Sequence, residues 1–147
     1  MSLALQAQPR TDDRPGQHIS IGPHGIAQLP SVLSPHQQKK ACDYIHQHLP
    51  ERMALKEIAG HLNLSSSHFS RVFKNSLGIS VGEWIHHQRV SMAVSLLNSE
   101  GKNISDIASE CGFFDQSHFH RVFKKITGVT PGRWKRSSHA TFSEVKT

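Results

Sequence analysis

Long apolar stretches and paired cysteines are both scarce in this chain. No segment approaches the run of about 18 apolar residues that a membrane-spanning helix needs, and the first residues lack the basic start and apolar run of a secretory signal. The two cysteines, Cys42 and Cys111, form no C-x-x-C pair, and each falls within an apolar helical pattern. We therefore expect buried, reduced thiols in a cytoplasmic protein that has no membrane partner.

Motifs of catalysis and metal binding are also absent. The sequence contains no Gly-rich phosphate loop, no G-x-S-x-G turn and no carboxylate pair isolated in an apolar setting. Neighbouring histidines occur three times among the twelve, as His46 with His48, His86 with His87 and His118 with His120. None of these pairs has the four-residue helical spacing or the cysteine partners of a zinc site. We expect neither an enzyme nor a metal or cofactor site.

The positive charge of the chain is unevenly distributed. The formal net charge is +6, with an isoelectric point near 9.7. The charges of residues 1–35 cancel, so the 15 basic and 9 acidic residues of 36–147 supply the whole excess. A compact basic domain favours a polyanionic partner, most often a nucleic acid. Charge alone leaves a merely soluble basic protein equally open.

One stretch of sequence occurs twice. Residues 67–84 read SHFSRVFKNSLGISVGEW and residues 117–134 read SHFHRVFKKITGVTPGRW, with ten of the eighteen aligned positions identical. Upstream, an apolar set also recurs: Leu55, Ile58, Ala59 and Leu62 align with Ile104, Ile107, Ala108 and Cys111. A fixed period means that one structural unit is used twice. Two copies suit a protein that presents the same small surface at two places on its partner.

The sequence of the first part of the chain predicts a tail that is followed by a helix. Residues 1–34 hold four of the seven prolines and little apolar periodicity, so we expect a flexible tail there. A helix should begin near Ser34 and Pro35, which suit the cap and the first helical position. It should run to about His48, because Pro50 lies just beyond.

Each copy of the repeat predicts two short helices joined by a tight turn. The first copy covers about 54–78, with Asn63 in the turn and Ser65 as the cap of the second helix. The second copy covers about 103–128, with Gly112 in the turn and Asp115 as the cap. Each pair of helices is a helix-turn-helix. The expected fold is therefore all-α, with about seven helices.

The remaining segments connect or follow these two units. Apolar residues recur at helical spacing over about 81–98, which predicts one long linker helix that packs against both units. A short final helix should begin at Pro131, and residues 137–147 should form a C-terminal tail. The ordered domain is expected to cover 35–136.

The second helix of each unit carries a polar outward face. If the aromatic and aliphatic residues point inward, the remaining positions are free to meet base edges and phosphates. This predicted DNA-binding set is Ser67, Ser70, Arg71 and Lys74 in the first unit, and Gln116, Ser117, His120, Arg121 and Lys124 in the second. An ordinary solvated helix face is the alternative. His68 and His118, which align in the repeat, are expected to pack beside the core.

The second unit, GFFDQSHFHRVFKKITGVTPGRWKR, resembles the signature of the AraC family of bacterial transcription regulators. The preceding LKEIAGHLNLSSSHFSRVFKNSLGISVGEWIHHQRVSMAVSLL is similar to that family's first helix-turn-helix and linker helix. The resemblance covers about 34–136. It implies a seven-helix domain that places two recognition helices in successive major-groove segments. In the family's base-reading positions the chain carries Ser67, Ser70 and Arg71, then Ser117, His120 and Arg121, and Gln116 matches a position near the phosphates.

The resemblance also implies a biological role. We expect a sequence-specific regulator of transcription that binds double-stranded DNA as a monomer, activates by contacting RNA polymerase, and resides with the nucleoid in the cytoplasm. Thirty-odd polar residues before the domain are too few for the effector domain of most family members, so the chain resembles the short members or an isolated module. Ala54 stands where a capping Ser or Thr is usual. The alternative is a protein-interaction module of the same fold that recruits or antagonises another regulator.

Overall fold

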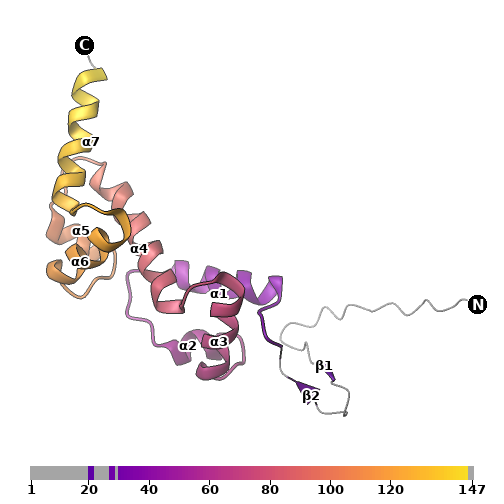
Figure 1. The fold of residues 1–147 in the computed structure, drawn as a ribbon. Coiled ribbons are helices and arrows are strands. Elements are labelled where there is room, and N and C mark those ends of the chain that lie inside the picture. Colours follow the sequence, from indigo (N-terminus) through magenta and orange to yellow (C-terminus); the bar gives the residue numbers. More distant parts are fainter. Residues whose placement is uncertain (1–19, 22–26, 29, 146–147) are drawn as a thin grey trace, which may run out of the picture. The chain divides into compact units, whose positions relative to one another are not determined.

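The computed structural model describes residues 20–21, 27–28 and 30–145, and within them the chain is mainly helical (Figure 1). The elements, in chain order, are β1 (Ser20–Ile21), β2 (Ala27–Gln28), α1 (Pro35–Gln47), α2 (Leu55–His61), α3 (Ser66–Leu77), α4 (Val81–Leu97), α5 (Ile104–Glu110), α6 (Gln116–Thr127) and α7 (Pro131–Val145). The all-α prediction with about seven helices is confirmed.

Two very short strands precede the helices. β1 and β2 pair in an antiparallel fashion, with Ser20 opposite Gln28 and Ile21 opposite Ala27. The sequence predicts a flexible tail over 1–34 and gives no indication of this pairing. The hydrogen bonds of a backbone ladder do not depend on an apolar pattern, so the sequence gives little sign of strands this short. Residues 1–19, 22–26 and 29 of the predicted tail lie outside the described residues.

The chain divides into two compact units, and α1 contributes to both. The first unit holds the described residues up to Tyr44 together with Ala54–Ser80, so it contains most of α1 and all of α2 and α3. Its buried core is formed by Leu33, Ala41, Ile58, Ala59, Leu62, Phe69, Val72 and Phe73. Ala59 is fully buried between neighbouring helices, where α2 and α3 pack together. A larger side chain would separate them.

Capping residues set the helix boundaries of the first unit. The Ser34 hydroxyl accepts the Gln37 N–H, and the Gln37 side chain accepts the Ser34 N–H in return, which closes both ends of a capping box at α1. Ser65 caps α3, as predicted, by accepting the His68 N–H. Asn63 has a φ of 59°, the left-handed conformation that the turn requires. Ala54 cannot cap α2, but Glu57 accepts its N–H at 3.0 Å.

The second unit contains Ile45–Met53 and everything from Val81 onward. Helices α4, α5 and α6 pack against one another, and α7 covers α4 and α6. The buried core consists of Val90, Ala93, Leu97, Ile107, Ala108, Cys111, Phe113, Phe119 and Phe123. Aromatic contacts tie α6 to its neighbours: Phe119 lies 4.9 Å from Phe113 in a tilted arrangement, and Phe123 lies 5.9 Å from Trp134 edge to face, centroid to centroid. These contacts fix the orientation of α6.

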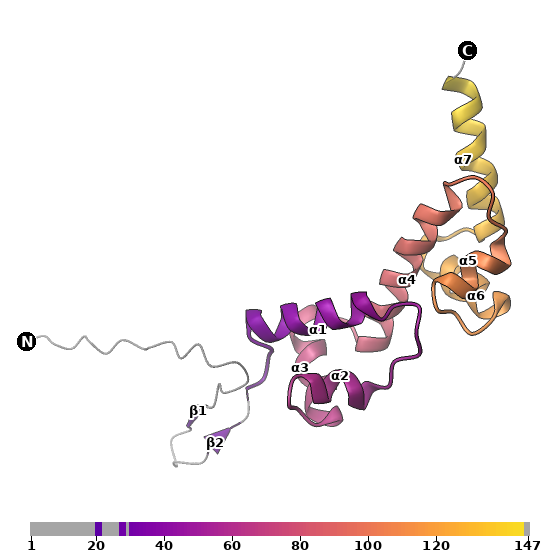
Figure 2. The ribbon, with the colours of Figure 1, turned by 180° about the vertical axis from the view of Figure 1, so that it is seen from behind.

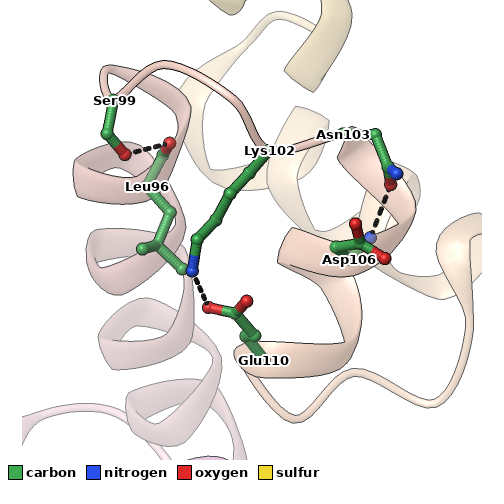
Figure 3. Close-up of polar contacts among 6 residues, drawn as sticks. All are labelled: Leu96, Ser99, Lys102, Asn103, Asp106 and Glu110. Carbon is green, nitrogen blue, oxygen red and sulfur yellow. Dashed lines mark hydrogen bonds and ion pairs between the residues drawn. The ribbon is translucent and has the colours of Figure 1, made fainter.

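Polar contacts close the loop that leads from α4 into α5 (Figure 3). The Asn103 side chain accepts the Asp106 N–H at 2.8 Å, which is the predicted N-cap of α5. The Ser99 hydroxyl donates to the Leu96 carbonyl at the end of α4. Lys102 pairs with Glu110 at 2.5 Å, although both side chains are substantially exposed and such a pair contributes at most about 1 kcal/mol. The caps, rather than the ion pair, define where α5 begins.

The segment that follows α1 packs against the second helix-turn-helix. The Arg89 guanidinium on α4 donates to the Leu49 carbonyl at 3.0 Å and to the Glu51 carbonyl at 2.8 Å. Gly112 lies so close that a Cβ added there would stand 2.4 Å from the Leu49 carbonyl oxygen. Arg52 lies 5.0 Å above the ring of Phe114. This part of the chain therefore supports the second unit, which the sequence did not indicate.

The final helix is longer than predicted. α7 continues to Val145, so the prediction of a tail over 137–147 is wrong for residues 137–145. After Gly132 no glycine or proline interrupts the helix, and two serines donate to carbonyls four residues earlier: Ser137 to Arg133 and Ser138 to Trp134. In both views the C-terminal half of α7 extends beyond the other helices of its unit (Figures 1 and 2).

The two thiols differ in burial. Cys111 is completely buried, and burial raises the pKa of its thiol to about 11. Cys42 on α1 is half-buried, and burial raises its pKa as well. Because the thiolate is the reactive form, neither side chain is activated as a nucleophile. Among the described residues no helix is long and apolar enough to cross a membrane.

Candidate nucleic-acid interface

Helix α3 separates its apolar and polar residues cleanly. Phe69, Val72 and Phe73 are buried, and Gly78 ends the helix in the left-handed conformation at a φ of 81°. The predicted contact residues lie on the other side of the helix: Ser67, Arg71 and Lys74 are exposed, and Ser70 is half-exposed. All four residues of the predicted first set thus reach the surface of one short helix.

Arg71 is held in place by a neighbour on the same helix. Its Nη2 lies 3.0 Å from Nδ1 of His68, and His68 itself is buried. The guanidinium carries every proton of this contact, so Nδ1 acts as the acceptor. The predicted role of His68 beside the core is confirmed, and the buried ring also orients an exposed arginine. A positioned guanidinium loses less side-chain entropy when it binds a base or a phosphate.

Helix α6 repeats this arrangement with stronger caps. Asp115 accepts the His118 N–H at 2.7 Å, and Gly128 ends the helix at a φ of 87°. Phe119 and Phe123 are fully buried. The exposed residues on the other side include most of the predicted second set: Gln116, Ser117, Arg121 and Lys124. Lys124 and Lys125 both lie in the last turn, where a helix favours positive charge.

His120 is placed differently from its predicted partners. It is only half-exposed, and its Nε2 is buried without a hydrogen-bond partner. A groove-facing donor would present that nitrogen at the surface, so in this conformation only Nδ1 remains for a partner. At the aligned position of α3 stands Ser70, whose small hydroxyl avoids the problem.

We expect His120→Leu to raise the free energy of unfolding by about 1 kcal/mol, because an apolar side chain removes a buried polar atom that has no partner. Urea unfolding monitored by circular dichroism measures this change. A loss of stability would mean that the imidazole makes a structural hydrogen bond that this conformation does not display. The matched change Ser70→Ala on α3 should alter stability by less than about 0.5 kcal/mol.

The two outward faces match in position and chemistry. Each presents a serine at its start, an arginine one turn later and a lysine near the end of the helix. Hydroxyl groups and guanidinium groups bind both base edges and phosphate oxygens, whereas lysine acts mainly as a positive point charge. A single such face is ordinary. Its repetition on both units is what indicates a common function.

A second group of basic side chains lies beside α6 and was not part of the predicted set. His86 and His87 on α4 and His118 and Lys125 on α6 line one cavity together with Arg121. The rings of His86 and His118 meet edge to face at 5.5 Å between centroids. Burial, and then His118 and the nearby cations, lower the pKa of His86 below its ordinary value of 6.5. Helical spacing within α4 gave no sign that its histidines would face α6.

Metal ligation has no geometric support within the described residues. In that part of the chain no three His, Cys, Asp or Glu side chains are grouped so as to hold a metal ion. The neighbouring histidines of α4 and α6 share their cavity with one carboxylate, Glu83, and with the cations Arg121 and Lys125. The basic residues therefore favour an anionic ligand over a cationic one.

Comparison with known proteins gives a consistent result. A family model described as a helix-turn-helix domain matches residues 58–137, which is more than half of the chain. The regulatory protein PocR of Salmonella typhimurium is 38% identical over 82 residues, covering 54% of this chain and 27% of that protein. The arabinose operon regulatory protein of Escherichia coli is 38% identical over 79 residues, covering 53% and 27%. The chain thus spans about a quarter of the length of these relatives.

Solved structures share the arrangement of helices. The C-terminal domain of AraT, a response regulator from Geobacillus stearothermophilus, has a TM-score of 0.66 at 34% identity, covering 71% of this chain and 86% of that one. The DNA-binding domain of AdpA, described as a global transcriptional factor in complex with a target DNA, has a TM-score of 0.68 at 23% identity, covering 71% and 95%. At that identity the second likeness shows the fold alone.

Proposed function

This chain belongs to the AraC family of DNA-binding transcription regulators, and from that premise we propose that it recognises a specific double-stranded DNA sequence through α3 and α6. The observation that carries the proposal is the repeated outward face. Arg71 with Lys74 on α3, and Arg121 with Lys124 on α6, are all exposed and occupy matching positions. In a helix-turn-helix this is the face that enters the major groove.

The two helices should contribute unequally to sequence recognition. The first face offers Ser67 and Ser70 beside its arginine, and a serine hydroxyl discriminates weakly among bases. The second has His120 at the position of Ser70, so an imidazole joins Arg121 on the face proposed to read bases. We propose that α6 carries most of the sequence preference and that α3 adds affinity.

One chain carries both recognition helices, so we propose that it binds DNA as a monomer, on a site of about two helical turns without two-fold symmetry. Activation of transcription through contact with RNA polymerase, in the cytoplasm, is the outcome that family membership favours. Whole-protein activities of the relatives concern chains about four times as long as the matched segment, so an effector response is not part of this proposal.

Salt dependence of binding tests the proposal. In a gel-retardation assay with a pool of DNA duplexes, the binding affinity should fall steeply as the salt concentration rises. The reason is that the lysines and arginines displace counterions from the phosphates. The logarithm of the binding constant against that of salt concentration should fall with a slope of at least about −3. DNA binding that does not change with salt concentration, or binding to a protein partner without any binding to DNA, would support the protein-interaction module instead.

We expect Arg121→Ala to weaken binding to the preferred site by about 1–3 kcal/mol and to relax the preference at one base position. The matched change Lys124→Ala removes the same charge from the same exposed face, but should weaken all sequences alike because lysine meets phosphates. Both variants are measured by competition between the preferred duplex and single-base variants of it. If Arg121→Ala and the unchanged protein prefer the same bases to the same degree, Arg121 does not read a base.

A further inference from the structure

A cavity of about 350 Å³ lies between the first half of α4 and one side of α6. Both helices belong to the second unit, so the cavity is a feature of one compact body. Its walls are Glu83, His86 and His87 from α4, and His118, Arg121, Val122, Lys125 and Ile126 from α6. None of the functions described above uses the α4 side of this cavity.

The chemistry of the walls is that of an anion site. Five of the eight lining residues carry an imidazole, a guanidinium or an ammonium group, and Glu83 is the single carboxylate. Nδ1 of His118 accepts the Phe114 N–H at 3.4 Å, a long contact that nonetheless favours the tautomer with its proton on Nε2. His118 therefore offers a donor even when it is neutral.

The size of the cavity and its apolar wall indicate a ligand that is larger than a bare ion. Its volume lies near the lower end of the range of about 300–1,000 Å³ that is typical of small-molecule sites. Val122 and Ile126 are both half-buried and supply an apolar wall. A phosphate attached to a sugar matches this division, with the charged group on the basic residues and the carbon atoms against the aliphatic ones.

We infer that the α4–α6 cavity binds a phosphate group, and that the backbone of bound DNA supplies it. The inference rests on the proposed function, because Arg121 belongs both to the cavity wall and to the outward face of α6. A phosphate next to the base that Arg121 reads would fix the register of the helix in the groove. α4 is then a phosphate-binding element as well as a connection.

The site makes DNA affinity dependent on pH. The groups that face His86 are Glu83, His87 and Arg89 on α4, His118, Arg121 and Lys125 on α6, and Arg52 ahead of α2. Burial, and then the neighbouring histidines and cations, lower the pKa of His86 below its ordinary value of 6.5 in the free protein. A bound phosphate offsets part of the local positive charge and so favours the imidazolium. Affinity therefore rises as the pH falls through the pKa of the complex.

The test measures duplex affinity between pH 8 and pH 5.5 at several salt concentrations. The unchanged protein should bind at least about threefold more tightly at the lower pH, and so should a His36→Gln control, whose histidine is exposed on α1 and lies outside the cavity. His86→Gln should lose that gain. Lys125→Gln should make the salt slope shallower by about 1, whereas Lys39→Gln, a remote loss of the same charge, should not.

Free phosphate separates the two sources of the ligand. Inorganic phosphate is titrated into DNA-free protein while the imidazole C–H resonance of His86 is followed by NMR. If both cavity variants bind DNA like the unchanged protein but lose phosphate binding, the ligand is a free phosphorylated molecule, and the backbone assignment is overturned. If they change neither measurement, the cavity is no phosphate site. Failure of the unchanged protein to bind any duplex would instead defeat the proposed function.

A folding control accompanies these variants. His87 and Lys125 are exposed, so substitutions there leave the core intact, whereas His86 is half-buried. If His86→Gln proves unstable by thermal melting, His87→Gln together with Lys125→Gln takes its place, and the pair should make the salt slope shallower. An unchanged slope in that pair overturns the inference.

Discussion

Gly112→Ala should lower the free energy of unfolding by about 2–4 kcal/mol, since it combines a left-handed backbone with a steric clash. The residue has a φ of 83°, and a Cβ there would stand 2.4 Å from the Leu49 carbonyl oxygen and 3.1 Å from the carbonyl carbon of Pro50. Both neighbours are backbone atoms, so they cannot rotate away. Relief requires the segment after α1 to move off the second helix-turn-helix.

Gly128→Ala is the matched control for that experiment. Gly128 has nearly the same conformation, with a φ of 87°, but nothing lies within 4 Å of an added Cβ. Its substitution should cost only the left-handed penalty, about 1–2 kcal/mol. Urea unfolding of both variants gives the difference directly. Equal losses would show that the close approach of Leu49 to the turn does not matter for stability.

Ala93→Pro should destabilise the second unit by about 3 kcal/mol or more. Ala93 lies in the interior of α4 and is completely buried in the core of this unit. Proline removes the N–H that bonds to the Arg89 carbonyl, and its ring collides with the preceding turn. Because Arg89 also binds the carbonyls of Leu49 and Glu51, a kink here disturbs the support of α6. Specific DNA binding should be lost with it.

Ala93→Gly keeps the backbone donor and provides the comparison. It should cost about 1 kcal/mol, the usual penalty of glycine in a helix interior, with little loss of DNA affinity. Unfolding midpoints and duplex titrations are measured for both variants. A proline variant with the stability and affinity of the glycine variant would show that α4 need not be continuous.

Local chemistry explains why so much of the fold could be predicted from sequence. Ser65, Asn103 and Asp115 are capping residues placed directly before apolar helical patterns, and each caps the predicted helix. Asn63 tolerates the left-handed turn, and its φ is 59°. Such signals depend only on neighbours in sequence. Apart from the end of α7, helix boundaries within the two units therefore agree with prediction to within a few residues.

Features that depend on distant contacts could not be predicted. The attachment of residues 45–53 to the second unit rests on Arg89, a polar residue whose partners are backbone carbonyls about forty positions away. No periodicity marks such a contact. The pairing of Ser20–Ile21 with Ala27–Gln28 and the extension of α7 to Val145 also lack an apolar signal.

The candidate interface was predictable in outline but not in detail. Exposure of Arg71, Lys74, Arg121 and Lys124 follows from the helical period once the inward face is known. The burial of one nitrogen of His120 depends on how α6 packs. Likewise, the cavity between α4 and α6 joins residues from two separate helices, so sequence spacing within either one does not indicate it.

Selection of bound sites from a pool of random duplex DNA measures whether this chain recognises a specific sequence. We expect enrichment of one asymmetric motif made of two parts, whose centres lie one helical turn apart, about 10–10.5 base pairs. The part read by α6 should be the better defined. A pool that shows no enriched sequence after repeated rounds, although the protein is folded, would contradict the claim that this chain recognises specific DNA.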